Sequence, residues 1–229
     1  NSCGTVRMSW LMRGRRICLM LVLLGLTTEA RAGAVPQRVD DKLDLAPAAG
    51  ATLTGWIGES IDTCLRGRIH GQKVRDLIVP FEVRNMTKWW RCEFWGKWYT
   101  SAALAYRHQP SPELRKILDD AVHALVKTQA DNGSITSYKP SAELRDWDVW
   151  GRKYSLLGML AYYDLTGDKM ILPAARRLAD HTLAQVGPGK RNIVTIGWWT
   201  GMAASSILEP MVLLYRRTGD KRYLDFAKY

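Results

Sequence analysis

A sequence repeat limits what this chain can fold into. The stretches "AYYDLTGDKMILPAA" and "LLYRRTGDKRYLDFA" both contain an apolar helical pattern with a tyrosine, then Thr-Gly-Asp-Lys, then a new helical pattern. Residues 166–169 return as 218–221, a spacing of 52 residues, and "LAYRHQPSPELRKIL" is an earlier, less regular copy. Glycine commonly ends a helix in the left-handed conformation, and aspartate is a preferred N-cap of the next helix. The repeat therefore predicts helical hairpins whose apolar faces are covered by neighbouring hairpins, in a solenoid or a closed ring.

Apolar periodicity places the helices of these hairpins. Residues 93–108 have their apolar side chains on one helix face. Residues 111–130 are predicted to form a helix with Ser111 as N-cap and Pro112 at the first helical position. Further helix pairs are predicted at 150–167 with 168–187, and at 201–219 with 220–229. The predicted fold class is all-α, with residues 56–85 forming either helices and turns or short strands.

The connections between hairpins are longer than those within them, and they carry tryptophans. Residues 131–149 and 188–200 link successive hairpins. Long loops at one end of a helical array are common places for binding sites. Indole faces beside charged groups suit the flat apolar faces and the hydroxyls of sugar rings. We therefore predict a carbohydrate site that includes Trp95, Trp98, Trp147, Trp150, Trp198 and Trp199. The alternative is that these tryptophans are lids that pack against helix ends.

Charged residues at helix starts and on apolar helix faces complete the candidate site: Glu93, Lys97, Asp148, Arg152 and Glu209. Glu209 lies within an apolar run and is predicted either to contact substrate or to make a structural hydrogen bond. Asp148 has the alternative role of helix N-cap, and Arg152 with Lys153 would then pair with it. His181 is predicted to be structural. Hydrolysis of a glycosidic bond needs two groups at a defined separation; the sequence gives no such distance, so we assign no acid and base.

The first part of the chain has the layout of a secretory signal. "MRGRRICLMLVLLGLTTEARA" combines a basic start, an apolar run over residues 17–26 and a small-residue end. The apolar run is too short to span a bilayer comfortably, although a membrane anchor is the alternative. We expect residues 1–32 to be upstream residues and signal peptide, 33–52 an extended leader, and 53–229 the helical domain. The protein is expected to be exported, with no stable membrane insertion after cleavage.

Charge and cysteine content narrow the classes of partner. The formal net charge is +11, but the basic residues are spread through helical patterns without a nucleic-acid motif. This favours a solvated mixed-charge surface and no nucleic-acid partner. Cys3 and Cys18 fall in the expected signal segment; Cys64 and Cys92 remain, and a disulfide between them is permitted after export. No CxxC or HExxH pattern specifies a metal site. The oligomeric state is not indicated.

Three stretches resemble a known family. They are "WRCEFWGKWYTSAALAYRHQPSPELRKILDDAVHALVKTQADNGSI", "WDVWGRKYSLLGMLAYYDLTGDKMILPAARRLADH" and "GMAASSILEPMVLLYRRTGDKRYLDFAKY". Over residues 53–229 the chain resembles the N-terminal part of the beta-L-arabinofuranosidase family, glycoside hydrolase family 127. The resemblance implies an (α/α)6 toroid-type barrel followed by β-sandwich domains. It also implies activity on arabinofuranose-containing glycans of plant or cell-wall origin.

The resemblance further implies that catalysis depends on a later part of the family sequence. Characterised members use a zinc-bound cysteine nucleophile, in a Glu-x-Cys segment with a Cys-Cys pair, and a separate glutamate as acid/base. All of these lie downstream of the three stretches. The chain is therefore expected to be a fragment with about half of the barrel, with no cofactor of its own and with zinc in the complete protein. Cys64 and Cys92 do not match the nucleophile segment.

The chain departs from the family at two positions. Many relatives have a histidine where this chain has Trp147, and another where it has Tyr154, which bears on the preference for arabinofuranosides. Glu209 falls where one branch of the family has the glutamate of a Gly-Met-Asn-Glu sequence. The predicted function is an exported glycoside hydrolase with an oligosaccharide or polysaccharide substrate. The alternative is a non-catalytic carbohydrate-binding or scaffold protein made of helical hairpins.

Overall fold

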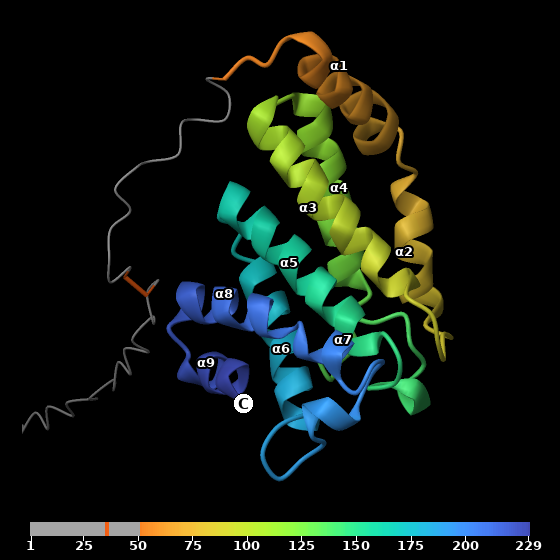
Figure 1. The fold of residues 1–229 in the computed structure, drawn as a ribbon, viewed down its shortest axis with the longest axis vertical. Helices are drawn as coiled ribbons and strands as arrows, with labels where there is room; N and C mark the ends of the chain where they lie inside the picture. Colours follow the sequence, from red (N-terminus) through yellow and green to blue (C-terminus); the bar gives the residue numbers. More distant parts are fainter. Residues whose placement is uncertain (1–34, 37–50) are drawn as a thin grey trace, which may run out of the picture. The chain divides into compact units, whose positions relative to one another are not determined.

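The computed structural model describes residues 35–36 and 51–229, and the fold below concerns these residues (Figure 1). The expected signal segment at 1–32 lies outside them, and so does most of the expected leader at 33–52. The prediction for these two segments stays a prediction.

The described part of the chain is built from helices. In chain order they are α1 (Gly55–Cys64), the π-helical turn η2 (Leu65–His70), α2 (Val74–Val83), η3 (Arg91–Glu93), α3 (Phe94–His108), α4 (Pro112–Lys127), η4 (Pro140–Ala142), α5 (Asp148–Thr166), α6 (Ile171–Gln185), η5 (Ile193–Thr195), α7 (Met202–Ser205), α8 (Leu208–Thr218) and α9 (Lys221–Lys228). α4 begins as predicted, with Ser111 as N-cap. Within residues 35–36 and 51–229 there is no strand, only isolated bridges at Met86–Tyr138 and Val186–Arg191. The all-α prediction is confirmed, and residues 56–85 form helices rather than short strands.

The helices pair as hairpins: α3 with α4, α5 with α6, and α8 with α9 (Figure 1). α3 also packs along α5, and glycines allow this close approach. A Cβ atom at Gly158 of α5 would overlap the ring of Trp95 on α3, and one at Gly96 of α3 would overlap the Tyr154 carbonyl. The buried core lies between the hairpins and includes Leu118, Leu125, Leu156, Met159, Leu160 and Leu178. The apolar face of each hairpin is thus covered by its neighbour.

The repeated Thr-Gly-Asp-Lys turns have the predicted backbone. Gly167 and Gly219 end α5 and α8 in the left-handed region, with φ of 65° and 68°. Asp220 is the N-cap of α9, as predicted. Asp168 differs, because α6 begins three residues later, at Ile171. The Oδ1 atom of Asp168 instead accepts a hydrogen bond from the Met170 N–H at 2.8 Å, which stabilises the turn before the helix.

The segment 201–219 is divided into α7 and α8 where the sequence predicted one helix. Pro210 is the third residue of α8. A proline has no N–H group and is tolerated in the first turn of a helix, where N–H groups have no intrahelical acceptor. In a continuous helix starting near residue 202 the same proline would remove an internal hydrogen bond. The break therefore keeps Pro210 in a first turn.

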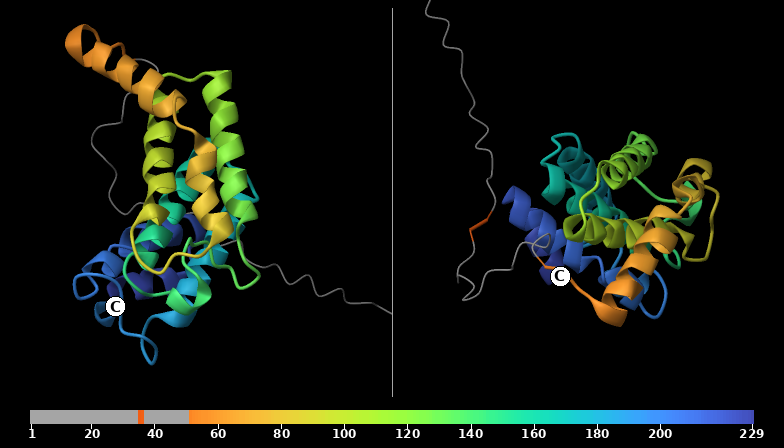
Figure 2. Two further views of the ribbon diagram at one scale, coloured as in Figure 1. Left: turned by 90° about the vertical axis from the view of Figure 1, so that its right-hand side faces the viewer. Right: turned by 90° about the horizontal axis from the view of Figure 1, so that it is seen from above.

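The first described helix, α1, is only loosely packed against the rest of residues 51–229. α1 projects from the end of the α3–α4 pair (Figure 2) and buries none of its side chains. Among the helices of residues 51–229, none combines the length and the apolar character needed to cross a bilayer.

Candidate functional site

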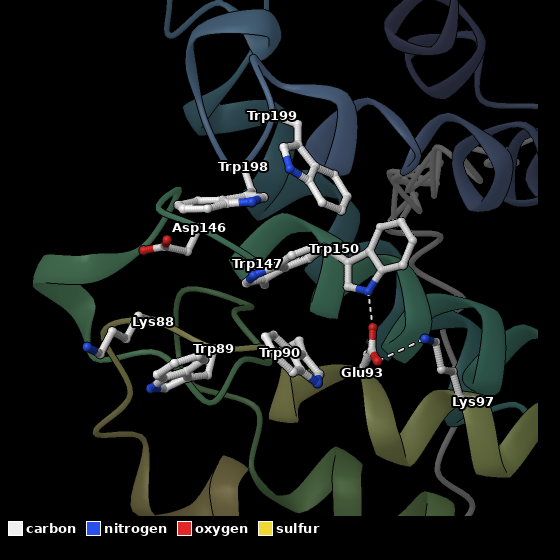
Figure 3. Close-up of a pocket in the computed structure, with 10 residues that line it drawn as sticks. All are labelled: Lys88, Trp89, Trp90, Glu93, Lys97, Asp146, Trp147, Trp150, Trp198 and Trp199. Carbon is white, nitrogen blue, oxygen red and sulfur yellow. Dashed lines mark hydrogen bonds and ion pairs between the residues drawn. The ribbon is translucent and has the colours of Figure 1, made fainter.

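A cavity of about 770 Å³ opens where three loops meet at the N-terminal ends of α3, α5 and α7 (Figure 3). This volume lies within the range of typical ligand sites. Its walls come from residues 88–97, 146–150 and 198–199, which are far apart in sequence. The side chains that line it are Lys88, Trp89, Trp90, Glu93, Lys97, Asp146, Trp147, Trp150, Trp198 and Trp199. Tryptophans therefore form most of the surface.

The tryptophan rings meet edge to face. Trp147 is the central ring: its centroid lies 6.0 Å from Trp90, 5.8 Å from Trp150 and 5.3 Å from Trp199, with interplanar angles of 73–82°. Trp89 continues the chain through Trp90 at 5.6 Å. Edge-to-face contacts of this kind stabilise aromatic pairs, and each contact covers a face of only one of the two rings. Several faces are open to solvent, since Trp89 is 56% exposed and Trp199 is 63% exposed.

The backbone of the cavity loops is strained. Trp89, Asp146 and Trp199 have φ of 76°, 44° and 51°, in the left-handed region that non-glycine residues seldom adopt. The neighbouring Leu144 and Thr200 do the same, at 65° and 53°. Such conformations cost about 1–3 kcal/mol each and persist only where the surrounding structure holds them. Three of these residues, Trp89, Asp146 and Trp199, line the cavity.

One end of the cavity carries a polar group built on Glu93. Its carboxylate accepts a hydrogen bond from Trp150 Nε1 and forms an ion pair with Lys97 Nζ at 2.8 Å (Figure 3). The Lys97 ammonium also lies over the rings of Trp150 and Tyr154, at 5.6 and 5.1 Å from their centroids. The Glu93 side chain is 9% exposed and that of Lys97 is 44% exposed. The pair offers both an acceptor and a donor to ligand hydroxyls.

The opposite end carries Lys88 and Asp146 (Figure 3). Lys88 Nζ lies 5.1 Å from the centroid of the Trp89 ring. Among the described residues, neither Lys88 nor Asp146 forms an ion pair. The lining thus holds two positive and two negative side chains, so its formal charges cancel.

The structure brings six of the predicted site residues to this cavity: Glu93, Lys97, Trp147, Trp150, Trp198 and Trp199. Four other lining residues were not among the predicted ones: Lys88, Trp89, Trp90 and Asp146. A signal for two of them exists in the sequence. The Trp89-Trp90 pair precedes α3 much as Trp198-Trp199 precedes α7.

Two predicted tryptophans lie elsewhere. Trp95 has no exposed surface; it stacks on Tyr99 with ring centroids 4.6 Å apart, and its Nε1 donates to the Ala121 carbonyl at 3.3 Å. Trp98 is half-buried and packs against the core. Both lie on α3 beside Lys97, which lines the cavity, but their side chains pack into or against the core. We therefore assign them to packing, which corrects their placement in the site.

Asp148 and Arg152 form a buried ionic network below the cavity. Arg152 Nη2 lies 2.6 Å from Asp148 Oδ2 and 3.0 Å from Glu143 Oε2, and both Asp148 and Arg152 have no exposed surface. Glu143 also pairs with Arg84 Nη2 at 2.6 Å and His181 Nε2 at 2.8 Å. These two predicted site residues support the loops instead of facing the cavity, and His181 has a structural partner.

The charge of Glu143 is held by this network. Burial by itself raises the pKa of its carboxyl, but hydrogen bonds from His181 and Gln185 and the positive charge of Arg152 outweigh burial and lower the pKa to about 2. The carboxylate therefore stays ionised and keeps its partners in place.

Glu209 lies outside the cavity lining. Its side chain is 56% exposed and pairs with Lys153 Nζ at 3.3 Å. Lys153 in turn lies over Trp150 and Tyr154, 5.2 Å from each ring centroid. Trp150 and Tyr154 are thus flanked by two lysines, each neutralised by a glutamate.

The cysteines are separate free thiols in the described part of the chain. Cys64 is exposed, while Cys92 is buried and its Sγ donates to the Trp147 carbonyl at 3.3 Å. Burial, followed by the charge of Asp148, raises the pKa of the Cys92 thiol, so it is a poor nucleophile. Within residues 51–229 no group of three or more His, Cys, Asp or Glu is placed to hold a metal ion. The described residues therefore hold no cluster of side chains that fits a zinc ion.

A known protein family matches most of this chain. The family described as "Beta-L-arabinofuranosidase, GH127 catalytic domain" matches residues 54–229. A curated relative is the non-reducing end beta-L-arabinofuranosidase of Bifidobacterium longum. It is 27% identical over 146 residues, which cover 58% of this chain and 21% of the relative. The chain thus spans about a fifth of the length of that relative.

Solved structures show the same fold. The GH127 beta-L-arabinofuranosidase Ara127N of Geobacillus stearothermophilus T6 is 22% identical, with a TM-score of 0.54 over 75% of this chain and 28% of that protein. A second GH127 beta-arabinofuranosidase is 20% identical, with a TM-score of 0.51 over 74% of this chain and 28% of its own. These likenesses confirm the predicted helical-barrel fold class.

Proposed function

Because this chain belongs to glycoside hydrolase family 127, we propose that the protein is a glycosidase acting on arabinofuranose-containing glycans of plant or cell-wall origin. The observation that carries the proposal for this chain is the tryptophan-lined cavity, which we assign to glycan binding. We also propose that the protein is exported, on the basis of the signal-like layout of its first residues.

The surface of the cavity suits a sugar chain. Exposed indole faces such as those of Trp89 and Trp199 provide flat apolar surfaces for the C–H faces of sugar rings. The ion pair of Glu93 and Lys97 supplies an acceptor and a donor for hydroxyls at one end. Because the charges of the lining cancel, the cavity favours a neutral glycan over an acidic one.

The part of the reaction that we assign to this chain is to bind and orient the sugar. The Glu93 carboxylate is tied to Trp150 and Lys97, and the buried Glu143 is tied to its own network. We therefore name neither as the general acid or the nucleophile. The catalytic residues are expected in the part of the family sequence that the resemblance places downstream.

A titration tests the proposal. Neutral arabino-oligosaccharide should shift or quench tryptophan emission of the protein in a saturable way. A synthetic beta-L-arabinofuranoside should be hydrolysed by a preparation that contains the whole family sequence. No saturable response to any neutral oligosaccharide would remove the assignment of the cavity to glycan binding.

A binding role without catalysis is the second candidate. Trp147 and Tyr154 occupy positions where the resemblance implies histidines, and the rings of both residues belong to the aromatic cluster at the cavity. If the same preparation binds oligosaccharide tightly but hydrolyses no glycoside, the binding role replaces the enzymatic one.

A further inference from the structure

The two tryptophan-bearing loops before α3 and α5 must be held in place by contacts with neighbouring residues. Trp89 and Asp146 have strained left-handed backbones, one on each loop. Neither loop is part of a sheet or a helix at these positions. Strained backbone persists only where neighbouring contacts hold it.

We propose that Tyr138 is a positioning residue whose phenol hydroxyl holds the two tryptophan-bearing loops at the spacing that the cavity requires. The hydroxyl donates a hydrogen bond to the Trp89 carbonyl at 2.6 Å and accepts one from the Trp147 N–H at 3.2 Å. One oxygen atom thus bridges the two loops. The Tyr138 side chain has no exposed surface, so water has no access to take its place.

Hydrogen bonds to the backbone on both sides of Tyr138 fix the position of its phenol between the two loops. Met86 N–H donates to the Ser137 carbonyl and Lys139 N–H donates to the Met86 carbonyl, both at 3.0 Å, which fixes the backbone on each side of Tyr138. Arg84 Nε donates to the Tyr138 carbonyl at 3.2 Å, while its Nη2 pairs with Glu143. The buried ionic network therefore anchors the residue that carries the bridge.

The bridge needs a neutral phenol, because the hydroxyl must donate to a carbonyl. Burial is the main influence and raises the pKa of Tyr138 well above its ordinary value. The hydroxyl consequently stays protonated in the neutral pH range, and the bridge does not depend on buffer conditions there.

If Tyr138 bridges the loops, its replacement by phenylalanine should affect the cavity, whereas the same replacement of another buried tyrosine should not. In Tyr138→Phe the ring remains, but the Trp147 N–H and the Trp89 carbonyl lose their partner. The matched control is Tyr99→Phe: Tyr99 is equally buried, and its hydroxyl donates to the Leu118 carbonyl at 3.1 Å, away from the cavity loops. Both changes remove one buried hydroxyl, so both should lower the melting temperature by a few degrees, about 2–4 °C per kcal/mol lost.

Only Tyr138→Phe should alter the cavity. Its near-ultraviolet circular dichroism, which reports the fixed geometry of the tryptophan rings, should lose amplitude relative to wild type and Tyr99→Phe. On the proposed glycan-binding function, its affinity for a neutral arabino-oligosaccharide should fall by roughly threefold to tenfold, because the two hydrogen bonds that fix the loops in the binding geometry are lost. Equal spectra and equal affinities in the two variants would overturn the proposal.

A measurement on the wild-type protein tests the bridge even if the Tyr138→Phe variant does not fold. The hydroxyl of Tyr138 is the acceptor for the Trp147 N–H, so this amide should exchange with solvent deuterium slowly. Exchange as fast as in an unfolded peptide would overturn the bridge without any substitution. If wild type binds no neutral oligosaccharide, the proposed function fails, while the spectra and the exchange rate still decide the role of Tyr138.

Discussion

Two tryptophans of this chain should respond in opposite ways to truncation. Trp95 is fully buried in the core, and Trp198 lines the cavity with 47% of its surface exposed. Trp→Ala in a packed core costs about 3–5 kcal/mol. With about 2–4 °C per kcal/mol for a chain of this size, Trp95→Ala should lower the melting temperature by roughly 6–20 °C.

The cost at Trp198 is smaller, because only about half of the side chain is removed from water. Full burial of a large apolar side chain stabilises a protein by about 1.5–3 kcal/mol, so half burial contributes roughly 0.8–1.5 kcal/mol. Trp198→Ala should therefore lower the melting temperature by only about 2–6 °C. Removal of the Trp198 indole should instead weaken binding, because the indole face is expected to stack on a sugar ring. We expect the affinity for oligosaccharide to fall about tenfold, which corresponds to about 1.4 kcal/mol.

The assay combines thermal unfolding followed by far-ultraviolet circular dichroism with an oligosaccharide titration followed by the remaining tryptophan emission. Affinity is expressed per folded molecule, so that a less stable variant is not scored as a weak binder. If Trp198→Ala melts as early as Trp95→Ala and binds oligosaccharide like wild type, the cavity tryptophans are lids and the division between core and site is wrong.

Three further substitutions test the site and its support. Glu93→Gln leaves the cavity with a net positive charge, so acidic oligosaccharides should bind more tightly than to wild type, and the gain should shrink in high salt when titrated at two ionic strengths. Folding lowers the pKa of Glu143 from 4.5 to about 2, so the ionised carboxylate stabilises the fold above pH 4.5, and this stabilisation is lost as the pH falls toward 2. The melting temperature of Glu143→Gln should therefore decline less than that of wild type between pH 4.5 and 2. An identical decline in both proteins would contradict the network. Gly158→Ala should lower the melting temperature, because overlap with the buried Trp95 ring costs about 1–3 kcal/mol and outweighs a helix-propensity gain of about 1 kcal/mol. At Gly67, where an added Cβ meets nothing within 4 Å, the same change should be neutral or stabilising.

The sequence by itself determined the helical hairpins and their ends. Ser111 and Pro112 start α4, and Gly219 with Asp220 separates α8 from α9, because capping depends on residues within one turn of each other. The same local signals recur with the repeat, and together with the family-like stretches they were enough for the fold class. At Asp168 the local signal was right in kind, but α6 begins three residues later, and the single helix predicted at 201–219 is divided before Pro210.

Only the tertiary structure decided which tryptophans line the cavity. Trp95 and Trp150 look alike in sequence, each near the start of a helix, yet Trp95 stacks on Tyr99 in the core while Trp150 faces Glu93 at the cavity. Their difference depends on which helix packs on which, and periodicity within one helix does not contain that information.

The support of the site was also decided by tertiary contacts. Glu143 meets Arg84 across 59 residues and His181 across 38 residues. Tyr138 joins loops whose tryptophans are 49 and 9 residues away. The left-handed backbone at Trp89 and Asp146 likewise depends on contacts with other segments, because neither residue type favours this conformation strongly enough alone. Local chemistry sets where helices begin and end, whereas the cavity exists because distant segments hold strained loops against one another.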